Sequence, residues 1–243
     1  GHPMLDRFAG AVDLPAPGPL PYKHLTVLLP GSRPGELARH LPPMLDAAKR
    51  IGAEVDTGFL VVLPSESLLP LFTRHCRPFA MDPARLPAGP CRTLAEARSF
   101  TRQVFRGLDV QIGRLPEALR AATIAIASTG TVTMECAFFQ VPTVALYKTS
   151  WSTYQIGKRI VTVDYLAMPN LLAKEAVFPE FVQGQATGKN LARAALRLLH
   201  DKPLRLATRE KLGQVIAGLG TAGANARAAR AIMDLLTPPS SAS

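Results

Sequence analysis

The sequence predicts an α/β fold in which a Rossmann-like, doubly wound parallel sheet is followed by C-terminal helices. Two observations predict it: short apolar segments of strand length alternate with longer segments of helical spacing, and loops containing Gly, Ser or Pro lead from strand to helix. This alternation is typical of a parallel sheet covered by helices on both faces. The 243 residues suffice to bury such a core, and no apolar run approaches the ~20 residues of a membrane span.

The expected strands are runs of mostly aliphatic and β-branched residues bounded by polar or turn-forming residues. They are residues 25–29, 58–63, 108–112, 123–127 and 143–147. The expected helices have apolar residues three and four positions apart. They are residues 36–50, a segment from Ser67, and residues 93–106, 116–121, 132–139, 191–200, 203–216 and 222–236. Several prolines and little periodicity predict irregular structure over residues 77–90.

Composition divides the chain into three regions. Residues 1–23 contain a Pro-rich, polar-poor stretch that predicts an extended inter-domain connector. Residues 24–190 hold the alternating segments and predict the Rossmann-like domain, and residues 191–243 predict an Ala- and Arg-rich C-terminal helical segment. Because the chain begins with Gly1-His2-Pro3 rather than Met, we expect it to be a piece of a longer protein.

The first loop whose residues suit ligand binding follows the first expected strand. Gly31 permits a tight turn, Ser32 offers a hydroxyl, and the amides that open the next helix favour an anion. Arg33 can form a bidentate contact with a phosphate, and Glu36 is either an N-terminal helix acid or a partner of Arg33. The loop is neither a P-loop nor a GxGxxG motif, and an ordinary strand-to-helix turn would look similar.

The second loop follows the fourth expected strand. Thr129, Gly130 and Thr131 form a small, hydroxyl-rich turn, and Glu135 lies one helical turn beyond Thr131. A carboxylate at that place can accept hydrogen bonds from a ribose diol while the loop amides face a diphosphate. The alternative is a capped helix whose Glu is solvated. Ligands of doubly wound sheets bind at the carboxyl ends of the strands, where both loops lie.

Other features select no chemistry by themselves. Asn170 follows Pro in an apolar run, and an amide there needs partners or forms a structural turn. Residues 148–159 mix aromatic and cationic side chains, which suits a membrane interface, a phosphorylated substrate or an amphipathic core helix. The formal net charge of +10 attracts nucleic acid, anionic lipid or phosphates alike. Three cysteines without CxxC spacing predict reduced thiols, and dispersed histidines predict no metal site and no catalytic triad.

Together these residues resemble the lipid-A-disaccharide synthase family, inverting glycosyltransferases of the GT-B fold. The resemblance runs in order along nearly the whole chain and is weakest over residues 64–108. Thr129 stands where the family usually has Ser. The motifs that carry the resemblance are GHPMLD (1–6), LLPGSRPGE (28–36), STGTVTMEC (128–136), VPTVALYK (141–148), IGKRIVTVDYLAMPNLLA (156–173) and VFPEFVQ (177–183).

The resemblance implies that this chain is the C-terminal half, which binds the UDP of the donor, UDP-2,3-diacylglucosamine. It places the N-terminal acceptor domain, the acceptor 2,3-diacylglucosamine 1-phosphate and the catalytic Asp outside the chain. It also implies a homodimer at the inner face of the cytoplasmic membrane, an anionic membrane surface as partner, and neither cofactor, metal nor nucleic acid. The implied donor-site residues are Gly31, Ser32, Arg33, Glu36, Thr129, Gly130, Thr131, Glu135, Asn170 and Gln183.

Three other functions stay open at this point. A different GT-B enzyme or a UDP-sugar epimerase would use the same two loops, although residues 164–172 favour the family named above. A non-catalytic basic module would bind DNA or anionic vesicles in a salt-sensitive way without any effect of UDP. A degenerate relative would bind UDP and transfer nothing.

Overall fold

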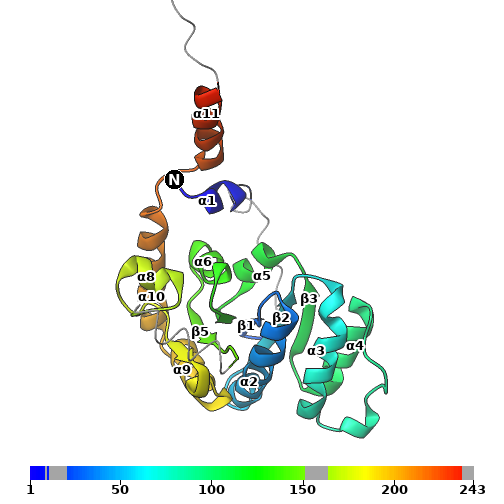
Figure 1. Cartoon of the computed structure of the whole chain (residues 1–243). Coiled ribbons are helices and arrows are strands. Elements are labelled where there is room, and N and C mark those ends of the chain that lie inside the picture. The colour runs from blue at the N-terminus through cyan, green and yellow to red at the C-terminus, as the bar shows by residue number, and fades with distance from the viewer. Residues whose placement is uncertain (9, 11–20, 151–163, 237–243) are drawn as a thin grey trace, which may run out of the picture.

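A six-stranded, all-parallel sheet forms the centre of the protein in the computed structural model, which describes residues 1–8, 10, 21–150 and 164–236 (Figure 1). The strand order is β3-β2-β1-β4-β5-β6, the doubly wound order of a Rossmann fold. The predicted fold class is therefore confirmed. The strands are β1 (His24–Leu29), β2 (Thr57–Leu63), β3 (Leu108–Ile112), β4 (Ile124–Ser128), β5 (Thr143–Tyr147) and β6 (Glu180–Val182).

One face of the sheet is covered by four helices that follow β1, β2 and β6 along the chain. They are α2 (Pro34–Gly52), α3 (Leu69–Cys76), α4 (Leu94–Val104) and α9 (Gly188–His200). Their buried side chains, with Phe59, form the larger hydrophobic core. The strands are buried on both faces, which is why they read as continuous apolar runs rather than as alternating ones.

The opposite face is covered by the helices that follow β3, β4 and β5, and by one from the C-terminal region. They are α5 (Leu115–Ala121), α6 (Thr131–Phe138), α8 (Met168–Ala173) and α10 (Lys202–Ala217). Short 3-10 turns complete the connections: Glu66–Leu68, Arg77–Phe79, Pro83–Arg85 and Gln183–Gln185.

Helix α1 (Pro3–Phe8) lies within the stretch that the sequence predicts as an extended connector. Its Met4 and Phe8 are buried and pack with Met134 of α6. Asp6 accepts hydrogen bonds from the backbone amides of Gly223 and Asn225, where α11 (Ala224–Leu236) begins. Helix α1 thus contacts both the sheet domain and α11. Helix α11 projects from the body of the protein beside α1 (Figure 1).

All the predicted strands and helices are present, with ends shifted by three residues or fewer. Among the helices and strands of the described residues, sequence patterns missed α1, α8 and β6, which have six, six and three residues. Helices that short are unstable in isolation and depend on tertiary contacts. The predicted boundary at residue 191 falls inside α9, whose buried residues belong to the main core. None of the described helices is long and apolar enough to cross a membrane.

Candidate functional site

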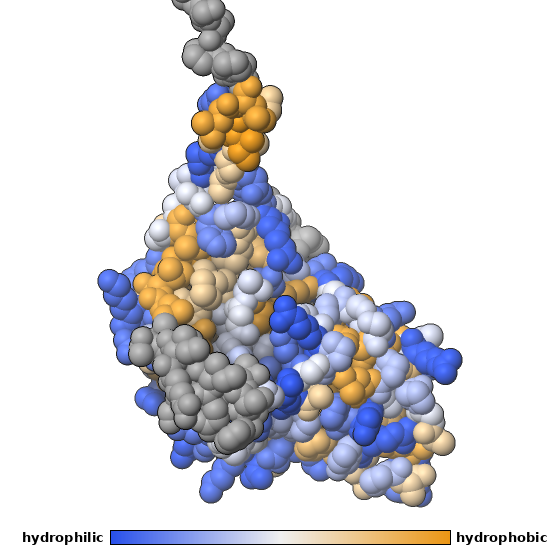
Figure 2. All heavy atoms as spheres, in the orientation of Figure 1, coloured by the Kyte–Doolittle hydropathy of each residue, from blue (hydrophilic) through white to orange (hydrophobic). Residues whose placement is uncertain are grey.

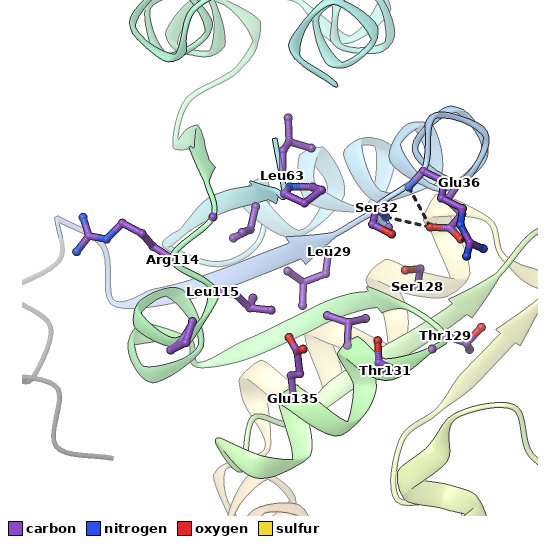
Figure 3. A pocket seen from close by; sticks show the side chains of 18 of the residues that line it. Leu29, Ser32, Glu36, Leu63, Arg114, Leu115, Ser128, Thr129, Thr131 and Glu135 are labelled. Carbon is purple, nitrogen blue, oxygen red and sulfur yellow. Dashed lines mark hydrogen bonds and ion pairs between the residues drawn. The ribbon is translucent and has the colours of Figure 1, made fainter. Parts of the chain in front are cut away.

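A cavity of about 730 Å³ opens at the carboxyl ends of β1 and β4. These neighbouring strands belong to opposite halves of the sheet, so the cavity lies at the topological switch point where doubly wound folds bind ligands. Both predicted loops line it (Figure 3). The predicted site residues that line it are Gly31, Ser32, Arg33, Glu36, Thr129, Gly130, Thr131 and Glu135.

The first loop is closed by its own glutamate. The carboxylate Oε2 of Glu36 accepts hydrogen bonds from the backbone amides of Ser32 at 2.9 Å and Arg33 at 3.3 Å (Figure 3). These two amides are therefore engaged before any ligand arrives. The Arg33 side chain is 83% exposed, and its Nη1 lies 3.6 Å from Glu36 Oε1. An anion at this loop would consequently be held by the guanidinium more than by the amides.

The second loop leads directly into α6, whose first residues line the cavity. Gly130 has φ 133°, a backbone conformation that favours glycine, and α6 begins at the next residue. The loop is held in place because the Thr129 amide donates to Leu146 O at 3.0 Å and the Thr133 hydroxyl donates to Gly130 O at 2.7 Å. The first amides of a helix have no intrahelical partner, and with the helix dipole they favour a phosphate.

Glu135 presents a carboxylate to the cavity from α6 (Figure 3). Its side chain is only 8% exposed, and its Oε1 lies 2.8 Å from Arg7 Nη1. Burial raises the pKa of this carboxyl, and the Arg7 guanidinium opposes that rise. Three arginines and two glutamates line the cavity, so its net charge is positive and suits an anionic ligand. They are Arg7, Arg33, Arg114, Glu36 and Glu135.

Two residues that sequence reasoning missed belong to this region. Arg7 reaches the cavity from α1, 128 residues before its partner Glu135. His40 is buried on α2, where its Nδ1 lies 2.9 Å from Pro30 O and its Nε2 accepts from the Lys148 amide at 3.0 Å. Burial lowers the pKa of His40, and the ring joins the first loop to the end of β5. No spacing in the sequence marks either residue, because their partners are distant along the chain.

Asn170 and Gln183 are not among the residues that line the cavity. The completely buried Asn170 donates through Nδ2 to Phe178 O and Glu180 Oε1, both at 2.7 Å, and accepts from the Phe178 amide. Gln183, with φ 50°, pairs its amide group with the backbone of Thr149 at 3.4 Å. Their contact with a donor stays a prediction. Most of the aromatic and cationic segment 148–159 lies outside the described residues.

Comparison with solved structures agrees with this architecture. The chain matches the C-terminal domain of a group 1 family glycosyltransferase from Francisella tularensis with a TM-score of 0.52 at 11% identity, over 84% of this chain and 89% of that one. It matches a calicheamicin glycosyltransferase with a TM-score of 0.51 at 15% identity, over 91% of this chain and 44% of that one. At such identities these likenesses concern the fold alone.

Comparison of sequences identifies the family. The chain is 37% identical to the lipid-A-disaccharide synthase of Solibacter usitatus and 32% identical to that of Anaeromyxobacter dehalogenans. Each alignment covers 97% of this chain and 54% or 56% of the relative, so the chain spans about half the length of these relatives. The family model described as lipid-A-disaccharide synthetase matches residues 108–231, just over half of the chain. The chain therefore belongs to the lipid-A-disaccharide synthetase family.

Proposed function

We propose that this chain is the donor-binding half of an inverting glycosyltransferase of lipid A biosynthesis. The enzyme would transfer the hexosyl group of UDP-2,3-diacylglucosamine to 2,3-diacylglucosamine 1-phosphate, giving lipid A disaccharide 1-phosphate and UDP. One observation carries the proposal: in a member of this family, both predicted loops converge on a single anion-favouring cavity at the switch point of the sheet.

The cavity suggests how UDP would sit. The diphosphate would lie between the Arg33 guanidinium and the N-terminus of α6, and the ribose hydroxyls would donate to the carboxylate of Glu135. In the transfer, the acceptor 6-hydroxyl oxygen bonds to the anomeric carbon while the bond from that carbon to the β-phosphate oxygen breaks. Negative charge then grows on the departing UDP, where the arginine and the helix N-terminus stabilise it.

The proton of the acceptor hydroxyl needs a base, and neither carboxylate of the cavity is placed for that work. Glu36 accepts from two backbone amides, and Glu135 is paired with Arg7. Burial raises the pKa of the neighbouring Cys136 thiol to about 12, so it stays protonated. We therefore assign the base to a part of the enzyme other than this cavity, as the family resemblance implies.

Calorimetric titration with UDP tests the proposal. We expect saturable binding that weakens at least about tenfold in Arg33→Ala and in Glu135→Ala, since each removes a charge-assisted hydrogen bond. The matched controls are Arg209→Ala and Glu210→Ala, two exposed neighbours on α10. Their affinity should equal that of the unaltered chain. A folded chain that does not bind UDP would refute the proposal.

The same preparation separates the rival of a basic module. Anionic vesicles and duplex DNA are added with and without UDP at low and high salt. An enzyme half at the inner face of the cytoplasmic membrane should bind anionic vesicles weakly and also bind UDP. Salt-sensitive binding to DNA or vesicles, with no UDP binding at all, would instead favour the non-catalytic module.

We further propose a homodimer formed through α11. This helix projects from the body and exposes an apolar side, the orange cap near the top of Figure 2. Its large apolar residues are 58% to 86% exposed. Apolar side chains gathered in this way on a surface typically mark an interaction site. A second copy of the same helix is a symmetric partner for such a surface. These residues are Ile232, Met233, Leu235 and Leu236.

Light scattering coupled to size-exclusion chromatography tests the dimer. We expect twice the chain mass for the unaltered protein and a monomer for the double variant Ile232→Asp/Leu235→Asp. The control Arg230→Asp changes the net charge of α11 by the same amount at another position and should leave the dimer intact. A monomer at micromolar concentration before any substitution would contradict the proposal.

A further inference from the structure

The N-terminal helix contributes an arginine to the cavity that neither of the two loops supplies. Arg7 of α1 is one of the residues lining the cavity, and its Nη1 lies 2.8 Å from Glu135 Oε1. The two residues are 128 positions apart in the chain. The pair described uses only Oε1, which leaves Oε2 of Glu135 for a ligand.

Helix α1 holds this arginine in a defined place. Phe8, the next residue, is buried, with its ring centroid 5.2 Å from that of Phe138 and 5.5 Å from that of Phe139, both in the segment that ends α6. The guanidinium carbon of Arg7 lies 4.9 Å from the Phe8 ring centroid. On the other side of α1, Asp6 accepts from the amides at the start of α11. These contacts fix the backbone from which the Arg7 side chain extends toward Glu135.

The two ends of the ion pair lie in different surroundings. The Glu135 side chain is 8% exposed, whereas the Arg7 side chain is 66% exposed. A carboxylate in such a position is desolvated and tends toward its neutral form unless a cation compensates. A neutral carboxyl would rotate to donate its proton and would accept less strongly from a diol. Arg7 therefore offsets part of the effect that burial has on the Glu135 carboxylate.

We propose that Arg7 is a positioning residue of the donor site, which keeps the Glu135 carboxylate charged and turned so that it accepts the ribose hydroxyls of a nucleoside diphosphate. The inference rests on the proposed function, because it takes Glu135 as the ribose acceptor. It assigns α1 to the site, whereas the sequence predicts an extended connector there. Arg7 acts through Glu135 and does not touch the diphosphate.

The test compares two probes, UDP and inorganic pyrophosphate, by calorimetry on four variants: Arg7→Ala, Arg7→Lys, Glu135→Gln and Arg7→Ala/Glu135→Gln. We expect Arg7→Ala to weaken UDP about tenfold and Arg7→Lys to restore most of the loss, since it returns the charge. The double variant should bind UDP no more weakly than Glu135→Gln alone. Pyrophosphate has no ribose, so its affinity should change much less than that of UDP in Arg7→Ala. Arg209→Ala, an exposed arginine on α10, is the control.

Each other outcome has one meaning. Equal losses for UDP and pyrophosphate in Arg7→Ala, or losses that add in the double variant, would overturn the inference and make Arg7 a direct ligand of the phosphates. A loss that Lys does not restore would overturn it in favour of a packing role. Unchanged UDP affinity in Arg7→Ala, with a loss in Glu135→Gln, also overturns it but leaves the proposed function standing. No UDP binding by the unaltered chain is the failure of the proposed function itself.

Discussion

Gly31→Ala should weaken UDP binding about tenfold, because it displaces the loop that carries Arg33. It should also lower the free energy of unfolding by about 2–4 kcal/mol, because it combines backbone strain with the loss of a cap. The residue has φ 111°, where an L side chain is strained. A Cβ there would also lie 2.6 Å from Glu36 Oε2 and 2.7 Å from Glu36 Cβ. Glu36 would have to move, releasing the amides of Ser32 and Arg33. Urea denaturation and calorimetry measure the two effects.

Two other glycines separate the causes. Gly130→Ala carries a similar backbone penalty at φ 133°, but an added Cβ meets nothing within 4 Å. It should therefore cost only the strain, about 1–3 kcal/mol. Gly89→Ala lies in an exposed loop with open space around it and no positive φ, and it should change stability by less than about 0.5 kcal/mol. If Gly31→Ala were no more costly than Gly130→Ala, the contact with Glu36 would not hold the loop.

Asn170→Asp should lower the free energy of unfolding by about 3 kcal/mol or more at neutral pH, since it leaves buried polar groups without partners. The side chain is fully buried, and its Nδ2 donates to both Phe178 O and Glu180 Oε1. A carboxylate of the same shape has no proton to donate and would face the Glu180 carboxylate. The Glu180 carboxylate also accepts from the amides of Leu166 and Ala167. Repulsion between the two carboxylates would therefore weaken the link between α8 and β6.

The effect should depend on pH with a definite sign. Burial beside another carboxylate raises the pKa of the introduced carboxyl above its unfolded value, so its neutral, donating form prevails at low pH. The loss of stability should therefore shrink as the pH falls from 8 to 5. Asn190→Asp, which changes a partly exposed residue in the first turn of α9, is the control and should stay within about 0.5 kcal/mol. Equal losses in the two variants would show that the buried amide does not join α8 to β6.

The Asn170 variant also bears on its predicted place in the donor site. Its three hydrogen bonds all go to other residues of the protein, and it does not line the cavity. If the folded variant binds UDP as tightly as the unaltered chain, Asn170 has a structural role. A weaker affinity at conditions where the variant is fully folded would support the donor contact.

The sequence by itself determined the fold class, the five longer strands and the two loops, because each follows from contiguous residues. Buried parallel strands need unbroken apolar runs, and a strand-to-helix turn needs residues such as Gly31 and Gly130. The order of family motifs along the chain determined the family as well. The three-residue β6 and the short α1 and α8 were missed because local patterns do not stabilise segments of that length.

Only the tertiary structure decided which groups share the cavity and which of them are already engaged. Glu36 occupies the amides of its own loop, and Arg7 crosses from the N-terminal helix to Glu135. His40 joins the first loop to the end of β5. Such pairs form between residues brought together by the packing of helices on both faces of a sheet. Their energies depend on burial and distance, and neither quantity is encoded in any local stretch of sequence.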